Sequence, residues 1–331
     1  MSLSISIALC TFNGGEFLPL QLKSIADQDR LPDELVICDD GSLDGSLDIL
    51  HEFARLAPFP VRVTKNEKTL GSTRNFNRAF SLCTGDVIVL GDQDDIWYPK
   101  KLARIENAFL RPCAPVAVFS DADLIDHRGK QLGLSLWQSF SFGVRDQKRF
   151  ANGQALNILV KHPVVTGATM AFHRKFVPLI SPIPPNHVHD NWSAFLLAAC
   201  GQFLPIAESL MQYRCHQQQQ IGPGRTRLRD RLARARSTGA NFYMEEIIRF
   251  RQVYERLEQR RADFPFGDGA LREIKAKISH REHRALLPRA SVSRFPKVIR
   301  EMLNGGYWRY SEGWESVAKD VAGVFGKRNP H

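Results

Sequence analysis

Residues 5–109 alternate short apolar runs with segments of helical character, and this alternation narrows the possible folds more than any other feature. The apolar runs are Ile5–Cys10, Leu35–Cys38, Val61–Val63 and Val87–Leu90. Each has the length of a buried strand. The segments between them repeat apolar residues at the spacing of a helix with one buried face. Strands that alternate with helices predict an α/β domain with a parallel, doubly wound sheet.

Polar side chains follow three of these runs, at the point where each predicted strand ends. In doubly wound sheets, ligands bind in the crevice beyond the carboxyl ends of the strands. Because these ends share one edge of the sheet, we expect side chains from separate segments to converge there. They are Thr11 and Asn13 after the first run, Asp39 and Asp40 after the second, and Asp92 and Asp94 after the fourth.

The fourth run ends in a cluster of carboxylates, Asp92, Asp94 and Asp95. Like charges crowded at the end of a buried strand repel one another and need a cation nearby. A divalent metal that carries phosphate is suitable, because Mg²⁺ usually takes one or two protein carboxylates and completes its shell with phosphate oxygens and water. The alternative is that these side chains only cap the helix that Pro99 opens.

Several other classes of site are excluded or disfavoured. The turn Thr11–Gly15 is not GxGxxG, which disfavours a Rossmann dinucleotide site, and the absence of GxxxxGK[ST] excludes a P-loop. The six cysteines form no CxxC pair, so we expect reduced, buried thiols and neither a disulfide frame nor a zinc site. No signal-peptide pattern and no apolar run near the ~18 residues of a membrane span occur, so we expect a cytoplasmic protein.

Charge is distributed unevenly along the chain. The net charge is +10, and the excess of Arg and Lys lies after residue 220. A basic tail favours an anionic partner, such as phospholipid, nucleic acid or a phosphorylated substrate. The breaker Gly222-Pro223-Gly224 predicts a boundary between residues 1–221 and a basic, mainly helical region over residues 222–331.

Four motifs occur in order along the chain: Ser6–Gly15, Asp39–Ser46, Gly71-x-x-x-Asn75-Phe76 and Asp92–Trp97. Together they resemble the family 2 glycosyltransferases of GT-A fold. The Asp-Gln-Asp-Asp-Ile-Trp form is most similar to the bacterial rhamnosyltransferase-like branch, which builds O-antigen and related surface polysaccharides. The resemblance implies a GT-A catalytic domain, with a doubly wound mixed sheet, over residues 1–221 and a helical C-terminal extension.

The resemblance also implies roles for individual residues. Asp40 matches the acidic residue that hydrogen-bonds the pyrimidine base of the donor. Asp92 and Asp94 match the Asp-x-Asp pair, in which Asp94 is the more reliable ligand of Mg²⁺ or Mn²⁺ and Asp92 usually faces ribose or a metal-bound water. The remaining residues implied in nucleotide-sugar binding are Thr11, Phe12, Asn13 and Asn75.

Asp190 opens an apolar helix and matches the position of the family's general base. In an inverting transfer, one carboxylate takes the proton of the acceptor hydroxyl as its oxygen attacks the anomeric carbon. The structural interpretation is that Asp190 is the N-cap of its helix, and we expect it to have that role too. Tyr213-Arg214-Cys215-His216 resembles the segment that closes the catalytic domain in this branch, which makes His216 a candidate metal ligand or diphosphate contact.

The resulting hypothesis is an inverting, metal-dependent glycosyltransferase that moves a sugar from dTDP-L-rhamnose or a UDP-sugar to a lipid-linked surface glycan. The basic tail interleaves aromatic residues with Arg and Lys, which predicts peripheral association with an anionic membrane. A helical subdomain with a solvated basic face is the alternative. No nucleic-acid-binding module is present, so we expect no nucleic-acid partner. Two other functions stay open: a sugar-phosphate nucleotidyltransferase and a non-catalytic nucleotide-sugar-binding protein.

Overall fold

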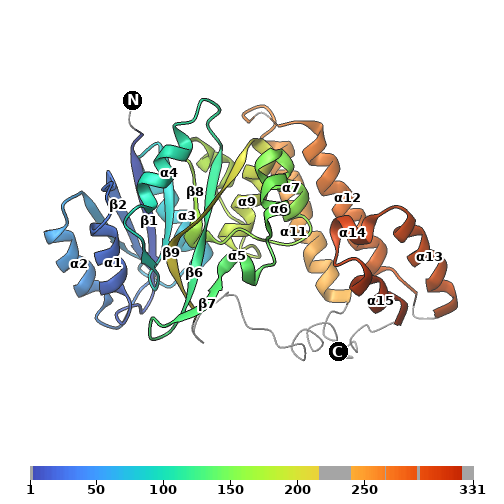
Figure 1. Ribbon diagram of the computed structural model, residues 1–331, viewed down its shortest axis with the longest axis horizontal. Helices are drawn as coiled ribbons and strands as arrows, with labels where there is room; N and C mark the ends of the chain where they lie inside the picture. The colour runs from blue at the N-terminus through green and yellow to red at the C-terminus, as the bar shows by residue number, and fades with distance from the viewer. Residues whose placement is uncertain (1–2, 216–239, 265, 289–290, 323–331) are drawn as a thin grey trace. The chain divides into compact units, whose positions relative to one another are not determined.

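The computed structural model describes residues 3–215, 240–264, 266–288 and 291–322 (Figure 1). Contacts within the chain divide it into two units, one with residues 1–155 and 164–223, the other with residues 156–163 and 224–331. The predicted boundary at residue 221 lies outside the described residues. The sequence did not predict that the segment 156–163 belongs with the C-terminal unit.

The first unit begins with the predicted alternation of strands and helices (Figure 1). Its strands β1, β2 and β4 are buried along almost their whole length, as in a sheet that is covered on both faces. The pairs β1–β2, β1–β4 and β2–β3 are parallel. The elements are β1 (Ile5–Thr11), α1 (Leu18–Ala26), β2 (Glu34–Asp39), α2 (Ser46–Leu56), β3 (Val61–Lys65), α3 (Ser72–Leu82), β4 (Val87–Asp92), β5 (Ile96–Trp97) and α4 (Lys101–Phe109).

The rest of the sheet makes it mixed. Strand β8 (Met170–His173) lies between β4 and β6 (Ala117–Asp126) and is antiparallel to both. The order of the described strands is β3-β2-β1-β4-β8-β6-β9-β5, with β7 (Gln131–Ser135) paired to β6. A doubly wound mixed sheet with a helical C-terminal region was expected, and it is confirmed.

Two segments of this region differ from what their sequence predicts. The segments Phe203–Ile206 and Leu210–Arg214 predict a short hairpin or strand pair, but they are one strand, β9 (Phe203–Cys215). Register shifts along its pairing with β6 let β9 continue past an irregularity without turning back. The run Val164–Phe172 predicts a strand interrupted by Gly167. The strand begins only at Met170, because Gly167–Thr169 forms a 3₁₀ turn, η2, closed by the Thr169 N–H on the Thr166 carbonyl.

The other described elements of the first unit connect and cover the sheet. The ring of Phe119 on β6 packs against four aromatic rings, those of Trp137, Phe142, Phe150 and Phe203, and this cluster holds the connecting helices to the strand. The elements are α5 (Leu136–Ser139), α6 (Val144–Arg149), η1 (Phe150–Gln154), the first residue of α7 (Ala155–Leu159), η3 (Arg174–Phe176), α8 (Val177–Ile180) and α9 (His189–Cys200).

The second unit is helical in its described part. Helices α11 (Ala240–Gln259) and α12 (Asp268–Ala285) are antiparallel, because Tyr243 contacts Arg284 while Arg261, beyond the other end of α11, pairs with Asp268. The remaining helices are α13 (Ser291–Leu303), α14 (Gly306–Tyr310) and α15 (Trp314–Ala322). The apolar residues of Met244–Arg260 recur at helical spacing and predict a helix, which corresponds to α11. The same spacing predicts a basic helix over Arg225–Arg236, which lies outside the described residues.

The second unit contains buried ion pairs. Arg284 binds Asp320 with two hydrogen bonds, of 2.7 and 3.0 Å, and the Tyr307 hydroxyl donates to the same carboxylate at 2.7 Å. Lys277 is buried as well and donates to the Tyr310 carbonyl at 3.0 Å. Among the described helices, none combines the length and apolarity that crossing a bilayer requires.

Candidate active site

The sheet brings the predicted site segments together at one edge. In the parallel registers, Thr11 lies opposite Asp39 and Cys10 lies opposite Asp92. The carboxyl ends of β1, β2 and β4 are therefore neighbours, and the predicted convergence of their loops is confirmed.

The loop after β1 is fastened to the loop after β2. Asp39 Oδ2 accepts hydrogen bonds from the hydroxyl groups of Thr11 (2.9 Å) and Ser42 (2.5 Å). The N–H of Asn13, whose φ is 47°, donates to Ser42 Oγ at 2.8 Å. Thr11 is buried by these contacts, whereas Phe12 and Asn13 remain exposed at the edge. Of the three predicted nucleotide-binding residues in this loop, Phe12 and Asn13 are accessible to a ligand and Thr11 is not.

Gln93, the middle residue of the acidic motif, is a contact that the sequence analysis missed. Its Oε1 accepts the N–H of Phe12 (2.8 Å) and its Nε2 donates to the Phe12 carbonyl (3.1 Å). The side chain packs so tightly that a Cβ on Gly14 would lie 2.3 Å from Gln93 Oε1. Gln93 therefore clamps the loop after β1 to the acidic turn after β4.

Asp40 is buried, and its carboxylate organises a neighbouring loop. Oδ1 accepts from Asn66 Nδ2 (2.7 Å) and the Leu70 N–H (2.8 Å), and Oδ2 accepts from the Gly71 N–H (2.8 Å). Each carboxylate oxygen has two acceptor positions, so Oδ2 retains capacity for one more donor. A contact between Asp40 and a base stays a prediction.

Asn75 has an internal role in this structure. It is buried, its Nδ2 donates to the Cys38 carbonyl (2.7 Å), and its Oδ1 accepts from Asn66 Nδ2 (2.9 Å). Both ends of its amide thus join β2 to the loop that Asp40 organises. Direct nucleotide binding by Asn75 stays a prediction.

The acidic turn concentrates negative charge. Burial, together with the nearby carboxylates of Asp94 and Asp190, raises the pKa of Asp92 to about 7. Burial and the charges of Asp94 and Asp92 also raise the pKa of Asp95 well above its usual range. Asp92 and Asp94 keep part of their surface open, whereas Asp95 is buried. The charge of Asp190 contributes to the raised pKa of Asp92. Asp190 therefore lies near Asp92 in the fold, although the two residues are distant in sequence.

Lys101 is the buried cation beside this turn, and the sequence analysis did not single it out. Its ammonium donates to the Ala168 carbonyl (2.7 Å), contacts Met211 Sδ (3.2 Å) and lies 3.9 Å from the centroid of the Trp97 ring. Burial lowers the pKa of Lys101 to about 7, against the opposing effect of Asp95 and Asp92. Lys101 is thus a buried cation among several carboxylates of this cluster.

Arg214 holds the backbone of the acidic turn from β9. Its Nε donates to the Asp94 carbonyl (2.8 Å), and its main-chain N–H donates to Asp95 Oδ1 (3.1 Å). The guanidinium also lies 4.7 Å from the centroid of the Phe17 ring. The Tyr-Arg motif thus fixes the main chain of the residue predicted to bind metal.

Asp190 lies in the first turn of α9, and the prediction that it is the N-cap is wrong. The cap is Val188, which offers no side-chain acceptor, and the helix begins at His189. Asp190 Oδ1 accepts the N–H of Asn191 (2.6 Å), and Oδ2 accepts the N–H of Gly167 (3.3 Å). A carboxylate in the first turn is stabilised by the helix dipole. Asp190 is partly exposed, which leaves it accessible to a ligand.

The side chain of His189 packs beside Gly167, whose N–H contacts Asp190. Its ring stacks on Phe76 with the centroids 3.9 Å apart, and neither ring nitrogen has a hydrogen-bond partner in the described part of the chain. A Cβ on Gly167 would lie 2.7 Å from His189 Nε2 and 3.5 Å from the Asp190 Cβ. A glycine within a predicted strand often marks close backbone approach or a bulge, and at Gly167 the backbone does approach its neighbours closely.

The residues present fit a divalent metal in part. Within the described residues, no group of three or more His, Cys, Asp or Glu side chains is arranged to hold one. Mg²⁺ needs only one or two protein carboxylates, and the charge repulsion that raises the pKa of Asp92 is what a cation would relieve. Asp92 and Asp94 therefore suit the ion. The third predicted ligand, His216, lies outside the described residues.

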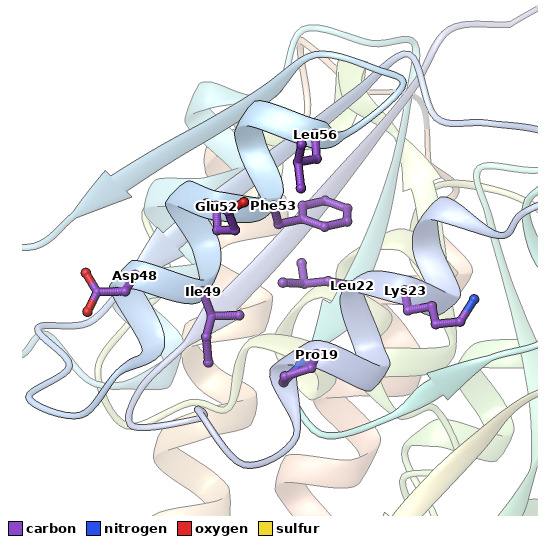
Figure 2. Close-up of a pocket in the computed structure, with 8 residues that line it drawn as sticks. All are labelled: Pro19, Leu22, Lys23, Asp48, Ile49, Glu52, Phe53 and Leu56. Atoms are coloured by element: carbon purple, nitrogen blue, oxygen red, sulfur yellow. The ribbon is translucent and has the colours of Figure 1, made fainter.

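A hollow of about 630 Å³ lies elsewhere, between α1 and α2 (Figure 2). Leu22 and Phe53 line it together with the charged side chains of Lys23, Asp48 and Glu52. None of the predicted site residues lines it, so the carboxylate edge is the candidate site.

A comparison with protein families assigns the chain to a family. The model of glycosyl transferase family 2 matches residues 6–177, more than half of the chain, and the match includes all four motifs. The chain belongs to glycosyl transferase family 2. The assignment confirms the resemblance inferred from the motifs.

Individual family members show partial similarity. An uncharacterised glycosyltransferase of Nostoc sp. (strain PCC 7120) is 27% identical over 219 residues, which cover 65% of each protein. A dTDP-rhamnosyl transferase of Shigella flexneri is 36% identical over 98 residues, 28% of this chain and 34% of that protein. An abequosyltransferase of Salmonella typhimurium is 31% identical over 105 residues, 31% of this chain and 32% of that protein. Each match spans less than two thirds of the relative.

Two solved structures share the fold. Residues 1–349 of S. aureus TarS in complex with UDP-GlcNAc give a TM-score of 0.57 at 14% identity, with 97% of this chain and 89% of that chain covered. The mannosyltransferase PcManGT of Pyrobaculum calidifontis, in complex with GDP-Man and Mn²⁺, gives 0.54 at 14% identity, with 98% and 85% covered. The GT-A architecture expected from the sequence is thereby confirmed.

Proposed function

We propose that the chain is an inverting, metal-dependent glycosyltransferase that uses a nucleotide-diphosphate sugar. The observation that carries the proposal is that Asp92 and Asp94 lie at the end of β4, at the carboxyl edge of the sheet, while Asp190 accepts the N–H of Gly167, whose neighbour Ala168 accepts a hydrogen bond from Lys101 beside the acidic turn. Family membership and the nucleotide sugars bound by the two structural neighbours support it.

In the proposed reaction, Asp190 takes the proton of the acceptor hydroxyl. The acceptor oxygen forms a bond to the anomeric carbon of the sugar, and the bond from that carbon to the diphosphate oxygen breaks with inversion. The electron pair leaves with the nucleoside diphosphate. A metal ion held by Asp94 and Asp92 would neutralise the charge that develops on this leaving group.

We further propose the donor dTDP-L-rhamnose and a lipid-linked bacterial surface glycan, such as an O-antigen precursor, as acceptor. The Asp92–Trp97 motif and the similarity to the Shigella flexneri dTDP-rhamnosyl transferase support this donor. Phe12 and Asn13, the exposed residues of the loop after β1, would lie under the nucleotide, and Asp40 would face its base.

A stability screen followed by a product assay tests the proposal. A ligand at about 100 times its dissociation constant adds ~2.7 kcal/mol to the free energy of unfolding. We expect dTDP-rhamnose with Mn²⁺ to raise the melting temperature, and Asp94→Asn to abolish the shift. Incubation with acceptor should then release nucleoside diphosphate. Release of pyrophosphate from dTTP and a sugar 1-phosphate would instead indicate a nucleotidyltransferase, and binding without turnover on any acceptor would indicate a non-catalytic binding protein.

A further inference from the structure

Helix α13 has a buried face that anchors it in the second unit. Val298 lies in a small core with Leu287, Tyr307 and Val317. The buried Arg294 donates from Nε to the Pro288 carbonyl at 2.7 Å. This face leaves the rest of the helix to present other side chains.

A second face of α13 is apolar and exposed. Phe295, Ile299 and Leu303 are 54%, 40% and 83% exposed. Because they are four residues apart, their side chains form one row along the helix. Single exposed apolar residues are ordinary, but a continuous row of large ones marks an interaction surface.

A third face of α13 is basic. Lys297 and Arg300 are exposed. At 100° per residue, Arg300 lies beside Leu303 in the apolar row and away from the buried face, whereas Lys297 lies on the side of the helix opposite the row. The acidic residue of this helix, Glu301, is turned toward the unit interior, where its Oε1 lies 2.5 Å from His280 Nδ1. The outward surface of α13 therefore combines apolar and positively charged side chains without a negative one.

We propose that α13 lies on the surface of an anionic membrane, with Phe295, Ile299 and Leu303 in the headgroup region and Arg300 on a lipid phosphate. An apolar row with a basic residue beside it fits an interfacial helix, and the excess of Arg and Lys after residue 220 is complementary to acidic lipid headgroups. The unit also exposes Trp308 and Trp314, whose rings contact each other with centroids 5.5 Å apart. Tryptophan is enriched where proteins meet the headgroup level.

The test uses the full chain, without donor or acceptor, so its outcome is independent of the proposed transferase activity. Flotation with phosphatidylcholine vesicles is compared with flotation with vesicles that also contain phosphatidylglycerol. Fluorescence gives a second readout: Trp97, Trp137 and Trp192 are buried in the first unit, so a blue shift on adding vesicles reports on Trp308 and Trp314.

We expect binding to the anionic vesicles alone. The double variant I299Q/L303Q should weaken binding about tenfold or more, and R300Q about fivefold. The matched controls are L56Q/L110Q and R111Q, which change exposed residues of the first unit. They should bind as the wild type does.

Three outcomes would overturn the proposal. They are no flotation with anionic vesicles, equal flotation of I299Q/L303Q and its control, and a wild-type oligomer that I299Q/L303Q dissociates without a change in vesicle binding. The third would show that the apolar row is a contact between protein chains. Circular dichroism and the melting temperature establish that each variant is folded.

Discussion

The buried ammonium of Lys101 donates a 2.7 Å hydrogen bond to the carbonyl oxygen of Ala168. Lys101 opens the helix after the acidic turn, and Ala168 follows Gly167, whose N–H reaches Asp190. The proposed metal turn and the proposed base are therefore tied to each other through one side chain.

Lys101→Met should destabilise the protein by about 3–5 kcal/mol, because it leaves Asp92 and Asp95 without their buried counter-charge. Mn²⁺ should then stabilise the variant more than the wild type, since the ion replaces the lost positive charge. Chemical unfolding with and without Mn²⁺ measures both effects. The control Lys100→Met changes an exposed neighbour. If the two variants were equally stable, Lys101 would not be the counter-charge.

Asp190→Asn should reduce turnover about 10²–10⁴-fold, the usual contribution of a general base, and leave the affinity for the donor within a few-fold of wild type. Steady-state kinetics and calorimetric titration of the donor separate the two quantities. Asp27→Asn is the matched control, since Asp27 lies at the far end of α1 in an exposed pair with Lys23. Near-normal turnover of Asp190→Asn would assign the base elsewhere.

Gly167→Ala should cost about 1–3 kcal/mol of stability, as overpacking does, and reduce turnover, because the new Cβ would lie 2.7 Å from His189 Nε2. The double variant G167A/H189A removes the clash and should recover part of the stability. Gly143→Ala, where no atom lies within 4 Å of the new Cβ, is the control. Thermal unfolding measures the stability of each variant. Equal melting temperatures for G167A and G143A would contradict the packing argument.

Metal binding should depend on pH through Asp92, whose pKa is raised to about 7. Below that pH a proton competes with the ion, so the affinity for Mn²⁺ should fall up to about tenfold per pH unit. Without metal, the unfolded carboxyl loses its proton near pH 4 while the folded one retains it, so Asp92 makes the protein less stable as the pH rises from about 4 to 7. Asp92→Asn should remove both trends, which titration of Mn²⁺ at pH 6 to 8 and unfolding at pH 4 to 7 would measure.

Asp320→Ala should destabilise the second unit by about 3–5 kcal/mol, because Arg284 then stays buried without its carboxylate. The double variant R284M/D320L removes both charges and should recover most of that loss. Glu315→Ala breaks the exposed pair with Lys319 and should cost less than about 1 kcal/mol. Chemical denaturation gives all three values, and a mild effect of Asp320→Ala would mean that water reaches Arg284.

The central fold could be predicted because its signals are local. The runs Ile5–Cys10 and Val87–Leu90 are buried strands whatever surrounds them, and the polar residues after them must share an edge. The strand pair expected over residues 203–214 failed because β9 forms one continuous strand between β6 and β5, and its length depends on those distant partners. The site residues also divide into those with a local sequence signal and those that depend on distant partners. Asp92, Asp94 and Asp190 stood out by motif, whereas Lys101 and Gln93 act through tertiary contacts that no short pattern reveals.

The cap of α9 shows why local rules fail at such a corner. Asp at a helix start usually caps, but here Val188 takes that place and Asp190 is turned toward Gly167. The helix gives up a side-chain cap, and the carboxylate is kept partly open at the carboxyl edge of the sheet.

The second unit is discontinuous in sequence, and this limits where the protein can be truncated or recombined. Residues 156–163 belong with the C-terminal helices although the chain then returns to the first unit, and Leu156, Ile158, Leu159 and Val160 are buried there. A truncation near residue 221 would leave these four apolar side chains on a fragment that lacks the helices they belong with. The C-terminal helices are thus not a detachable module, and recombination at a single crossover would not transplant them intact.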